Sequence, residues 1–575
     1  MNPAQLLAHF DRISDAPDAI PRLRQFIFDL AVRGKLVEQD PRDEPVSELV
    51  MRIQAEKTRL GKEGKSRKQE QLPPIDAKII PFQAPKYWAW LPLKRIGSLS
   101  GGMTPSKNRW DFWDGDINWF SPKDVKSDEL VQSELKITRS GLEEAGLRLY
   151  PPGCLFMVAR SGILKRTFPV SINRVEATLN QDLKVLRPFV DGLERYLQIM
   201  FRGMTDVILS TLVKTGTTVQ SLKYEEFELQ LFPLPPLAEQ QRIVAKVEEL
   251  MALCDRLEAS QSERESRRDR LAAASLHRLN NGAAADAFRE HARFTLDNLP
   301  RLTTRSEHIQ QLRKTILNLA VRGKLVSQDP KDEPASELLK RIQAEKARLL
   351  KEGKIGPEKP PIPARADELA FELKPGWQAA RLSQILVELQ TGPFGSSLHQ
   401  SDYQKGGIPV INPASIKNER LVPVESMAIG PETLKRLSTF KLRAGDIVMA
   451  RRGEMGRCAV VTKQENGWLC GTGSLILKLP EFVFPHFFVT LIGSPFVREY
   501  LGSSAVGATM QNLNQSILLN LVIGLPPLAE QQRIVAKVEE LMALCNRLEA
   551  QLATTQTESR RLLEAVLHDA LVSAA

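Results

Sequence analysis

The 575-residue sequence lacks most of the motifs on which catalysis depends. Its five cysteines form no CxxC pair, which argues against a zinc site or a disulfide framework and suits a reducing compartment. The seven histidines are scattered without the spacing of metal ligands, and no Ser/His/Asp or Cys/His arrangement stands out. No GxxxxGK[ST] phosphate loop, no GxGxxG after a strand and no NPPY-type tetrapeptide of amino-methyltransferases occurs. We therefore expect a chain that is not an enzyme and carries no metal or cofactor of its own.

Long hydrophobic runs are also missing. No apolar run reaches 18 residues, and the first residues lack the basic region and apolar core of a signal peptide. We expect a cytoplasmic protein that does not enter a membrane. Its net charge of +10 favours a polyanionic partner, and its length predicts several domains.

Two long internal repeats are the most informative feature that is present. The 21 residues Leu234–Cys254 recur without change at Leu525–Cys545, 291 positions later. Upstream, Leu23–Lys65 returns at Leu312–Lys354 with 32 of 43 positions identical. The stretches between these copies, about 85–232 and 376–523, have nearly equal length but mostly different sequence. We call the repeated segments the frames and the variable stretches between them the inserts. Constant frames around two different inserts indicate two different binding surfaces that are held in a fixed relation to each other.

The identical 21-residue string predicts a long helix that has prolines in its first turn. Its apolar residues alternate at spacings of four and three, as in the seam of a two-helix coiled coil. These residues are Ile243, Val247, Leu250, Cys254 and Leu257. Helical composition continues to about Leu279 and Val572, which makes rods of roughly 60 Å. Because even the outer faces are identical, we expect them to contact identical partners. The first long helix is followed directly by the second helical repeat, with which we expect it to pair. If the two termini meet, the second long helix pairs with the first helical repeat in the same way.

The inserts consist of short β-rich runs that end at Gly and Pro turns, so each is predicted to be one globular domain with a substantial sheet. The predicted fold is α/β (α+β), with two β-rich domains, a pair of long antiparallel coiled-coil helices between them and a pseudo-two-fold internal repeat. The predicted domains are a helical region (1–84), the first insert (85–232), a central region (233–375), the second insert (376–523) and a C-terminal long helix (524–575).

Loops of the inserts carry side chains that suit DNA. Arginine can bind guanine and phosphate, whereas Asn and Gln suit adenine. The loops occur at matching positions in the two inserts but carry different side chains. An example is GTTVQSL (216–222), which corresponds to GATMQNL (507–513). The predicted DNA-binding residues are Lys107, Arg109, Ser121, Lys123, Arg160, Ser161, Lys165, Arg166, Lys214, Thr217, Thr218, Gln220, Ser396, Ser397, His399, Asn412, Arg451, Arg452, Arg457, Thr509, Gln511 and Asn512.

Essentially the whole chain resembles the specificity subunits of type I restriction–modification systems. The resemblance is carried by LAVRGKLVxQDPxDEPxSELLxRIQAEKxRL, PLPPLAEQQRIVAKVEEL and insert signatures such as TGPFGSSL. It implies two target recognition domains, each of which reads one half of a bipartite, asymmetric site in double-stranded DNA. It also implies partners: two methylation subunits that bring S-adenosylmethionine for adenine N6, and two ATP- and Mg²⁺-dependent translocase and nuclease subunits. The 286–308 connector departs from this pattern.

Three other functions are considered. A stand-alone DNA-binding regulator or decoy would need tight binding without partners. A nuclease or methyltransferase in its own right lacks the motifs. A purely structural scaffold explains the repeated helices but not the divergent, loop-rich inserts.

Overall fold

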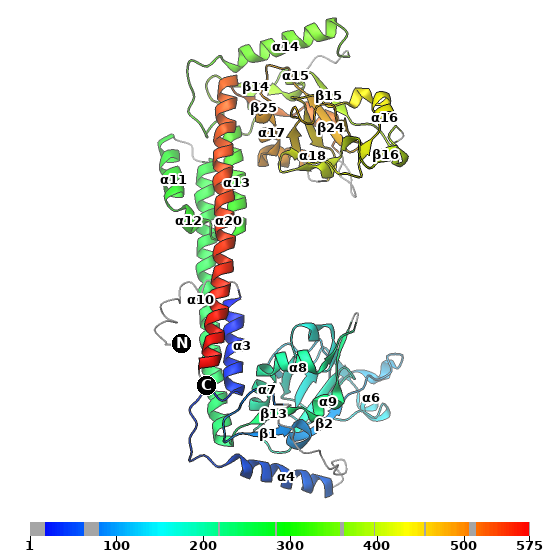
Figure 1. Ribbon diagram of the computed structural model, residues 1–575, viewed down its shortest axis with the longest axis vertical. Coiled ribbons are helices and arrows are strands. Elements are labelled where there is room, and N and C mark those ends of the chain that lie inside the picture. The colour runs from blue at the N-terminus through cyan, green and yellow to red at the C-terminus, as the bar shows by residue number, and fades with distance from the viewer. Residues whose placement is uncertain are drawn as a thin grey trace. The chain divides into compact units, whose positions relative to one another are not determined.

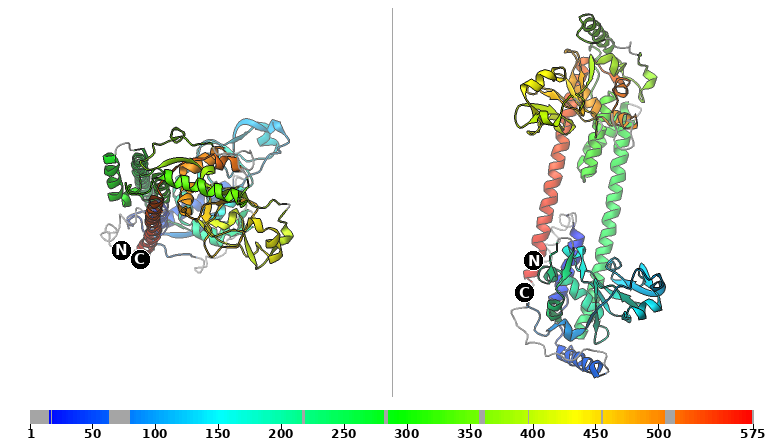
Figure 2. Two further views of the ribbon diagram at one scale, coloured as in Figure 1. Left: turned by 90° about the horizontal axis from the view of Figure 1, so that it is seen from above. Right: turned by 90° about the vertical axis from the view of Figure 1, so that its right-hand side faces the viewer.

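The computed structural model describes residues 16, 18–62, 80–216, 219–281, 285–356, 362–395, 397–453, 456–504 and 513–573. Residue contacts divide the chain into two compact units, Met1–Arg264 with Thr555–Ala575, and Glu265–Thr554. Each unit contains one insert and one copy of the helical repeat. Figures 1 and 2 show their elements from three sides.

Two long helices, α10 (Leu237–Asn281) and α20 (Leu528–Ser573), contain all but the first three residues of the identical strings. The first unit holds residues 237–264 of α10 and 555–573 of α20, and the second unit holds the rest of each helix. Along α10, Ile243, Val247 and Cys254 are buried, as the predicted seam requires. The prolines do not lie in the first turn as predicted: they precede the helix, and Pro236 O accepts the first helical hydrogen bond, from Gln240 N at 2.9 Å.

The helical repeats form α3 (Ala19–Val32) with α4 (Val46–Lys62), and α13 (Ser306–Val321) with α14 (Ala335–Lys351). Helices α3 and α13 end just before Gly34 and Gly323. These glycines have φ of +66° and +65°, a left-handed conformation that glycine adopts without a Cβ clash. The connector at 286–308 contains most of α11 (Ala285–Asp297) and all of α12 (Leu299–Leu302).

The same ion pair fastens the repeat to the long helix in both units. Arg24 of α3 binds Glu258 of α10 at 2.6 Å, and the equivalent Arg313 of α13 binds Glu549 of α20 at 2.9 Å. Figures 1 and 2 show α3 running beside α10. The recurrence of the contact indicates that the two frames are built alike.

Each helical repeat also contacts the other long helix. In the first unit, Arg22 of α3 binds Glu564 of α20 at 2.8 Å, and a small apolar cluster joins the same part of the chain to α20. In the second unit, His308 Nε2 of α13 lies 2.9 Å from Asp269 Oδ1 of α10. The predicted pairing of the last long helix with the first helical repeat is confirmed.

A third repeated contact joins the start of each long helix to the QDPxDEP segment of the helical repeat, residues 39–45 in the first copy and 328–334 in the second. Arg242 binds Asp43 at 2.6 Å, and Arg533 binds Asp332 at the same distance. In the second unit, Trp377 Nε1 also donates a hydrogen bond of 3.0 Å to the buried Glu530 of this helix turn.

The first insert is closed at its base by β1 (Ala89–Pro92) paired with β13 (Leu231–Leu234). Its main sheet has the order β2 (Gly97–Gly101), β10 (Leu183–Pro188), β6 (Leu155–Val158), β8 (Val170–Asn173) and β4 (Glu129–Leu130). Two smaller sheets are β5 (Leu135–Ile137), β3 (Trp113–Phe120), β9 (Ala177–Leu179); and β11 (Val213–Lys214), β12 (Gln220–Leu222), β7 (Arg160–Ser161). Its helices are α5 (Leu93–Ile96), η2 (Trp110–Phe112), α6 (Arg139–Glu144), η3 (Gly162–Lys165), α7 (Glu194–Gly203), α8 (Thr205–Thr211) and α9 (Tyr224–Leu229).

The second insert repeats this plan. It is closed by β14 (Gln378–Arg381) with β25 (Val522–Leu525), and its main sheet has the order β15 (Glu388–Thr391), β24 (Ser474–Lys478), β21 (Ile447–Ala450) and β22 (Cys458–Val460). The other strands are β16 (Tyr403–Gln404), β20 (Ala428–Ile429), β17 (Ile408–Ile411), β23 (Leu469–Cys470), β18 (Ile416–Lys417) and β19 (Arg420–Leu421). Its helices are η4 (Ala366–Glu368), α15 (Leu382–Ile385), η5 (Gln400–Asp402), η6 (Pro413–Ser415), α16 (Pro431–Arg436), η7 (Ser438–Phe440), α17 (Pro485–Gly493), α18 (Pro495–Ser504) and α19 (Gln515–Leu519).

Aromatic packing fills the first insert beside the strand pair that closes it. Phe168, Phe201, Phe227 and Phe232 are fully buried and in mutual contact, with ring centroids 5.4–6.0 Å apart. Each buried phenylalanine contributes roughly 1.5–3 kcal/mol of hydrophobic stabilisation. This core belongs to the same apolar cluster as residues of α3 and α10, so the insert is held firmly on its frame.

Candidate nucleic-acid interface

One short turn gathers the predicted DNA-binding loops of the first insert. Residues 180–182, here called the first junction turn, connect β9 to β10. Asn180 N donates to Phe120 O at 2.9 Å, directly before the predicted Ser121. Met103 N donates to Leu179 O at 2.9 Å, which brings the loop after β2 to the same place.

Two further loops meet on the other side of this turn. Arg160 N donates to Asp182 O at 3.1 Å. Arg160 and Ser161 form β7, which pairs with β12, where Gln220 lies opposite Ser161. Four loops that are far apart in the sequence therefore converge at the first junction turn.

The second insert has the equivalent second junction turn at residues 471–473, 291 positions later. Gly471 N donates to Ile411 O at 2.9 Å, just before the predicted Asn412, and Arg451 N donates to Gly473 O at 2.9 Å. Leu513 N donates to Arg451 O at 3.1 Å. These main-chain contacts of the turn correspond in the two inserts, whereas the side chains differ.

Four cations beside the first junction turn are exposed. Their side chains make no ion pair or hydrogen bond with the described residues. These cations are Arg160, Lys165, Arg166 and Lys214. Such side chains are available for phosphate or base edges. Lys107 and Lys123 are exposed as well.

Other predicted residues of the first insert are already occupied within the fold. Arg109 binds Asp111 at 2.7 Å and Glu144 at 3.1 Å. The hydrogen bond from Arg109 lowers the pKa of Asp111. The Oγ of Ser121 donates to the carboxylate of Asp124 at 2.8 Å and helps to shape its turn.

Gln220 is buried rather than exposed. Its Nε2 donates to Gly216 O at 3.2 Å, while its Oε1 has no hydrogen-bond partner among the described residues. Ser161 is half-buried, and its Oγ accepts a hydrogen bond from Ile163 N at the start of η3.

In the second insert the predicted residues differ in their exposure and contacts. His399 and Arg452 are exposed. Arg451 Nε donates to the main chain at Leu513 O at 3.1 Å, and Asn412 Nδ2 donates to the sulfur of Met427 at 3.3 Å.

Ser397 and Arg457 are half-buried. The carbonyl of Ser397 accepts a hydrogen bond from Arg436 at 2.5 Å. The predicted residues that lie outside the described residues are Thr217, Thr218, Ser396, Thr509, Gln511 and Asn512.

The junction turns themselves were not among the predicted residues. Gln181 is exposed and accepts a hydrogen bond from Thr104 Oγ1 at 2.5 Å, and Thr472 is half-buried at the equivalent place. The sequence does contain a signal for them: Asn-Gln-Asp and Gly-Thr-Gly stand 291 positions apart between β-rich runs. Since the two triplets share no residue, only the constant spacing marks them.

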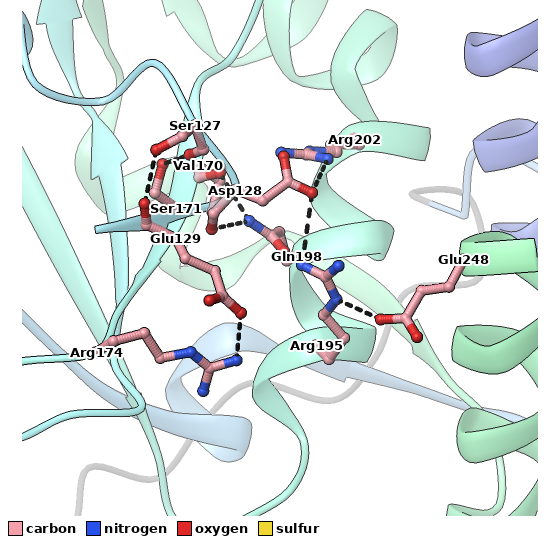
Figure 3. Close-up of polar contacts among 10 residues, drawn as sticks. All are labelled: Ser127, Asp128, Glu129, Val170, Ser171, Arg174, Arg195, Gln198, Arg202 and Glu248. Atoms are coloured by element: carbon pink, nitrogen blue, oxygen red, sulfur yellow. Dashed lines mark hydrogen bonds and ion pairs between the residues drawn. The ribbon is translucent and has the colours of Figure 1, made fainter. Parts of the chain in front are cut away.

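An ion-pair network secures the first insert on its long helix (Figure 3). Arg202 of α7 binds Asp128 at 2.6 Å, and Gln198 Nε2 donates to the main-chain oxygen of Asp128 at 2.7 Å. Arg195 Nε binds Glu248 of α10 at 3.0 Å, so the network reaches the frame. In the second insert the equivalent positions are Glu419, Val489, His486, Gly493 and Glu539.

The described residues contain no group of three or more His, Cys, Asp or Glu side chains that could hold a metal ion. All five cysteines are free and buried, and burial raises the pKa of the Cys154 thiol to about 11. Within the described ranges, the helices include none with the length and apolar composition needed to cross a membrane.

Residues 85–265 and 375–555 each match the family model of the type I restriction modification DNA specificity domain. The chain belongs to this family. It is 29% identical over 568 residues to the Escherichia coli type I restriction enzyme EcoEI specificity subunit, and 30% identical over 578 residues to the EcoAI subunit of the same species. Each alignment covers 96% of this chain and 94% of the relative. A solved HsdS subunit from Thermoanaerobacter tengcongensis aligns with 86% of this chain and 99% of its own, at 18% identity and a TM-score of 0.42.

Proposed function

We propose that the chain is the non-catalytic specificity subunit of a type I restriction–modification complex. Each insert is a target recognition domain that reads one half of a bipartite DNA site. The frames recruit methylation subunits, which carry out adenine N6 methylation with S-adenosylmethionine. Restriction subunits that use ATP and Mg²⁺ complete the assembly. The proposed recognition domains are residues 85–232 and 376–523, flanked by the helical regions 1–84, 233–375 and 524–575.

The observation that carries this proposal is the pair of junction turns. Corresponding main-chain hydrogen bonds, to Phe120 O and Ile411 O and from Arg160 N and Arg451 N, gather loops at the turn in both inserts, but the side chains that the loops present are different. An arrangement of this kind keeps the geometry of a DNA reader and changes the sequence that it reads.

The partner-binding part of the proposal rests on the exposed faces of the long helices. Five exposed residues lie along one face of α10, and the same five lie on α20. The first set is Gln241, Ala245, Glu249, Ala252 and Arg256; the second is Gln532, Ala536, Glu540, Ala543 and Arg547. Packing within a unit constrains buried positions, not exposed ones. Identity at exposed positions therefore supports one kind of partner at two equivalent sites, that is, two methylation subunits per chain.

A matched set of variants tests this docking surface. We expect Ala245→Arg or Ala536→Arg to leave one methylation subunit bound and the double variant to leave none, because an added arginine prevents close helix packing while preserving helix propensity. Native mass spectrometry of the co-expressed complex gives the stoichiometry. Ser140→Arg, which adds an arginine at an exposed position of α6 in the first insert, is the control. Two bound subunits in the double variant would disprove this surface.

Genome-wide mapping of N6-methyladenine, with and without this chain, tests the function itself. We expect methylation at a single bipartite motif only when chain and methylation subunits are expressed together. Nanomolar, sequence-specific binding by the chain alone in a salt-dependent shift assay would instead favour a stand-alone regulator. Methyl transfer by the purified chain alone would contradict the non-catalytic assignment.

A further inference from the structure

A large exposed apolar side chain stands beside each junction turn. Met103 is 52% exposed and Phe394 is 67% exposed. Each follows closely on a glycine that packs against the turn. A Cβ on Gly102 would lie 1.9 Å from Leu179 O, and one on Gly392 would lie 2.0 Å from Gly471 O, so only glycine fits. These two glycines sit at equivalent places, because β2 and β15 pair in the same register with β10 and β24.

The main chain at both positions is fixed. Met103 donates its N–H to Leu179 O at 2.9 Å, and its carbonyl accepts a hydrogen bond from Trp119 Nε1 at 3.0 Å. The carbonyl of Phe394 accepts hydrogen bonds from Ser397 N at 2.8 Å and Leu398 N at 3.2 Å. A fixed backbone that leaves an apolar side chain in water gains little hydrophobic stabilisation from it. Folding therefore does not account for these side chains.

Single exposed apolar residues are common and need no explanation by themselves. The informative fact is that one lies close to the glycine at each junction turn: Met103 directly follows Gly102, and Phe394 lies two positions after Gly392. The loops at these turns carry cations, Arg160 and Arg166 in the first insert and Arg452 in the second. Cations there suit phosphates and base edges, and the major groove exposes one apolar group, the C5-methyl of thymine. Phenylalanine and methionine supply the apolar surface that this methyl group matches.

We propose that Phe394 and Met103 each contact the C5-methyl group of a thymine in the half-site read by their own domain. The proposal rests on the DNA-reading function proposed above and adds a specificity-determining residue to each domain. It predicts that both half-sites contain a thymine, on either strand, whose methyl group contributes to binding.

Replacement of thymine by deoxyuridine tests this directly, because only the methyl group is removed. The assay is fluorescence anisotropy of the complex with its methylation subunits, at fixed salt, on the mapped site. We expect one such replacement in the second half-site to weaken binding about three- to tenfold. Phe394→Ala should weaken binding to thymine DNA by a similar factor and show no further loss on the deoxyuridine DNA. Met103→Ala should behave likewise for the first half-site.

Two variants serve as controls. Phe394→Leu keeps apolar contact and should retain part of the sensitivity to deoxyuridine. Val422→Ala removes an exposed apolar side chain elsewhere in the same domain and should change nothing. Equal melting temperatures show that the variants are folded.

Two results would overturn the inference while leaving the proposed function intact. The first is that Phe394→Ala binds thymine DNA as tightly as the wild type. The second is that Phe394→Ala weakens binding to deoxyuridine DNA as much as to thymine DNA, so that the two losses of affinity add; the ring would then contact another part of the DNA. A complex that binds all sequences equally would contradict the proposed function itself.

Discussion

At the scale of single residues, the duplication supplies natural controls. Asp29 of α3 is half-buried against α7, and its counterpart in the second copy is Asn318. Burial raises the pKa of Asp29 to about 6, from an unperturbed value of 3.8. Nearby Asp206 raises it as well, while Gln25 and Arg33 oppose the shift. At this position the second copy has the neutral amide of Asn318, whereas the first has the carboxyl group of Asp29, whose charged form is disfavoured by burial.

We expect Asp29→Asn to stabilise the first unit by about 1–2 kcal/mol at pH 8, a value reduced for partial exposure. The folded pKa lies above the unfolded one, so the folded state binds the extra proton. Wild-type stability therefore falls as pH rises from about 4 through about 6. The advantage of the variant should nearly vanish at pH 4. Urea unfolding of both proteins at pH 4 and pH 8 measures this difference in the free energy of unfolding. Asn318→Asp should have the opposite effect, and an advantage of Asp29→Asn that is independent of pH would contradict this explanation.

The exposure of a candidate site residue can be predicted from the sequence, whereas an ion pair with a partner far away in the sequence cannot. Arg160, Lys165 and Arg166 are exposed as a DNA-binding loop requires. Arg109 looks equivalent in the sequence, yet it pairs with Glu144, which lies 35 positions away. No local sequence pattern predicts the Arg109–Glu144 ion pair, because it depends on how α6 packs against η2.

At the scale of secondary-structure elements, the two inserts contact long-helix segments of identical sequence in different ways. Glu248 of α10 and Glu539 of α20 have the same sequence context. Glu248 pairs with Arg195 at 3.0 Å, whereas Glu539 forms no ion pair with a described residue. His486 stands at the equivalent place in the second insert.

We therefore expect Glu248→Gln to lower the local stability of α7 against α10 by about 0.5–1 kcal/mol, the usual range for a partly exposed pair. Glu539→Gln should leave α17 unaffected. Hydrogen exchange resolved by peptide reports both helices in one experiment. Faster exchange of α17 and not of α7 would show that the ion pair is not what holds the first insert.

The elements themselves were largely predictable. The apolar spacing predicts the long helices and their C-terminal ends to within a few residues, because an amphipathic stripe is a local feature. The strand order was not predictable. The pairings of β2 with β10 and of β3 with β9 join segments separated by more than 50 residues, and no short-range rule specifies them.

At the scale of the whole molecule, the closing strand pairs make each insert a replaceable module. β1 pairs with β13 and β14 pairs with β25 over four residues each, from Ala89 opposite Leu234 and from Gln378 opposite Leu525. Main-chain pairing of this kind depends little on side chains. Replacement of an insert should therefore leave its frame, and the partner-binding faces of the frame, unchanged.

A chain that carries residues 376–523 in both frames should then recognise a site in which the second half-sequence occurs twice. The first half-sequence should disappear from the motif, while methylation continues at a normal level because both docking faces remain. Methylation mapping in cells that express this chain with its partners gives the new motif. The reverse exchange, with residues 85–232 in both frames, should give the other half-sequence twice. An unchanged motif from either chain would mean that the frames, rather than the inserts, select the DNA.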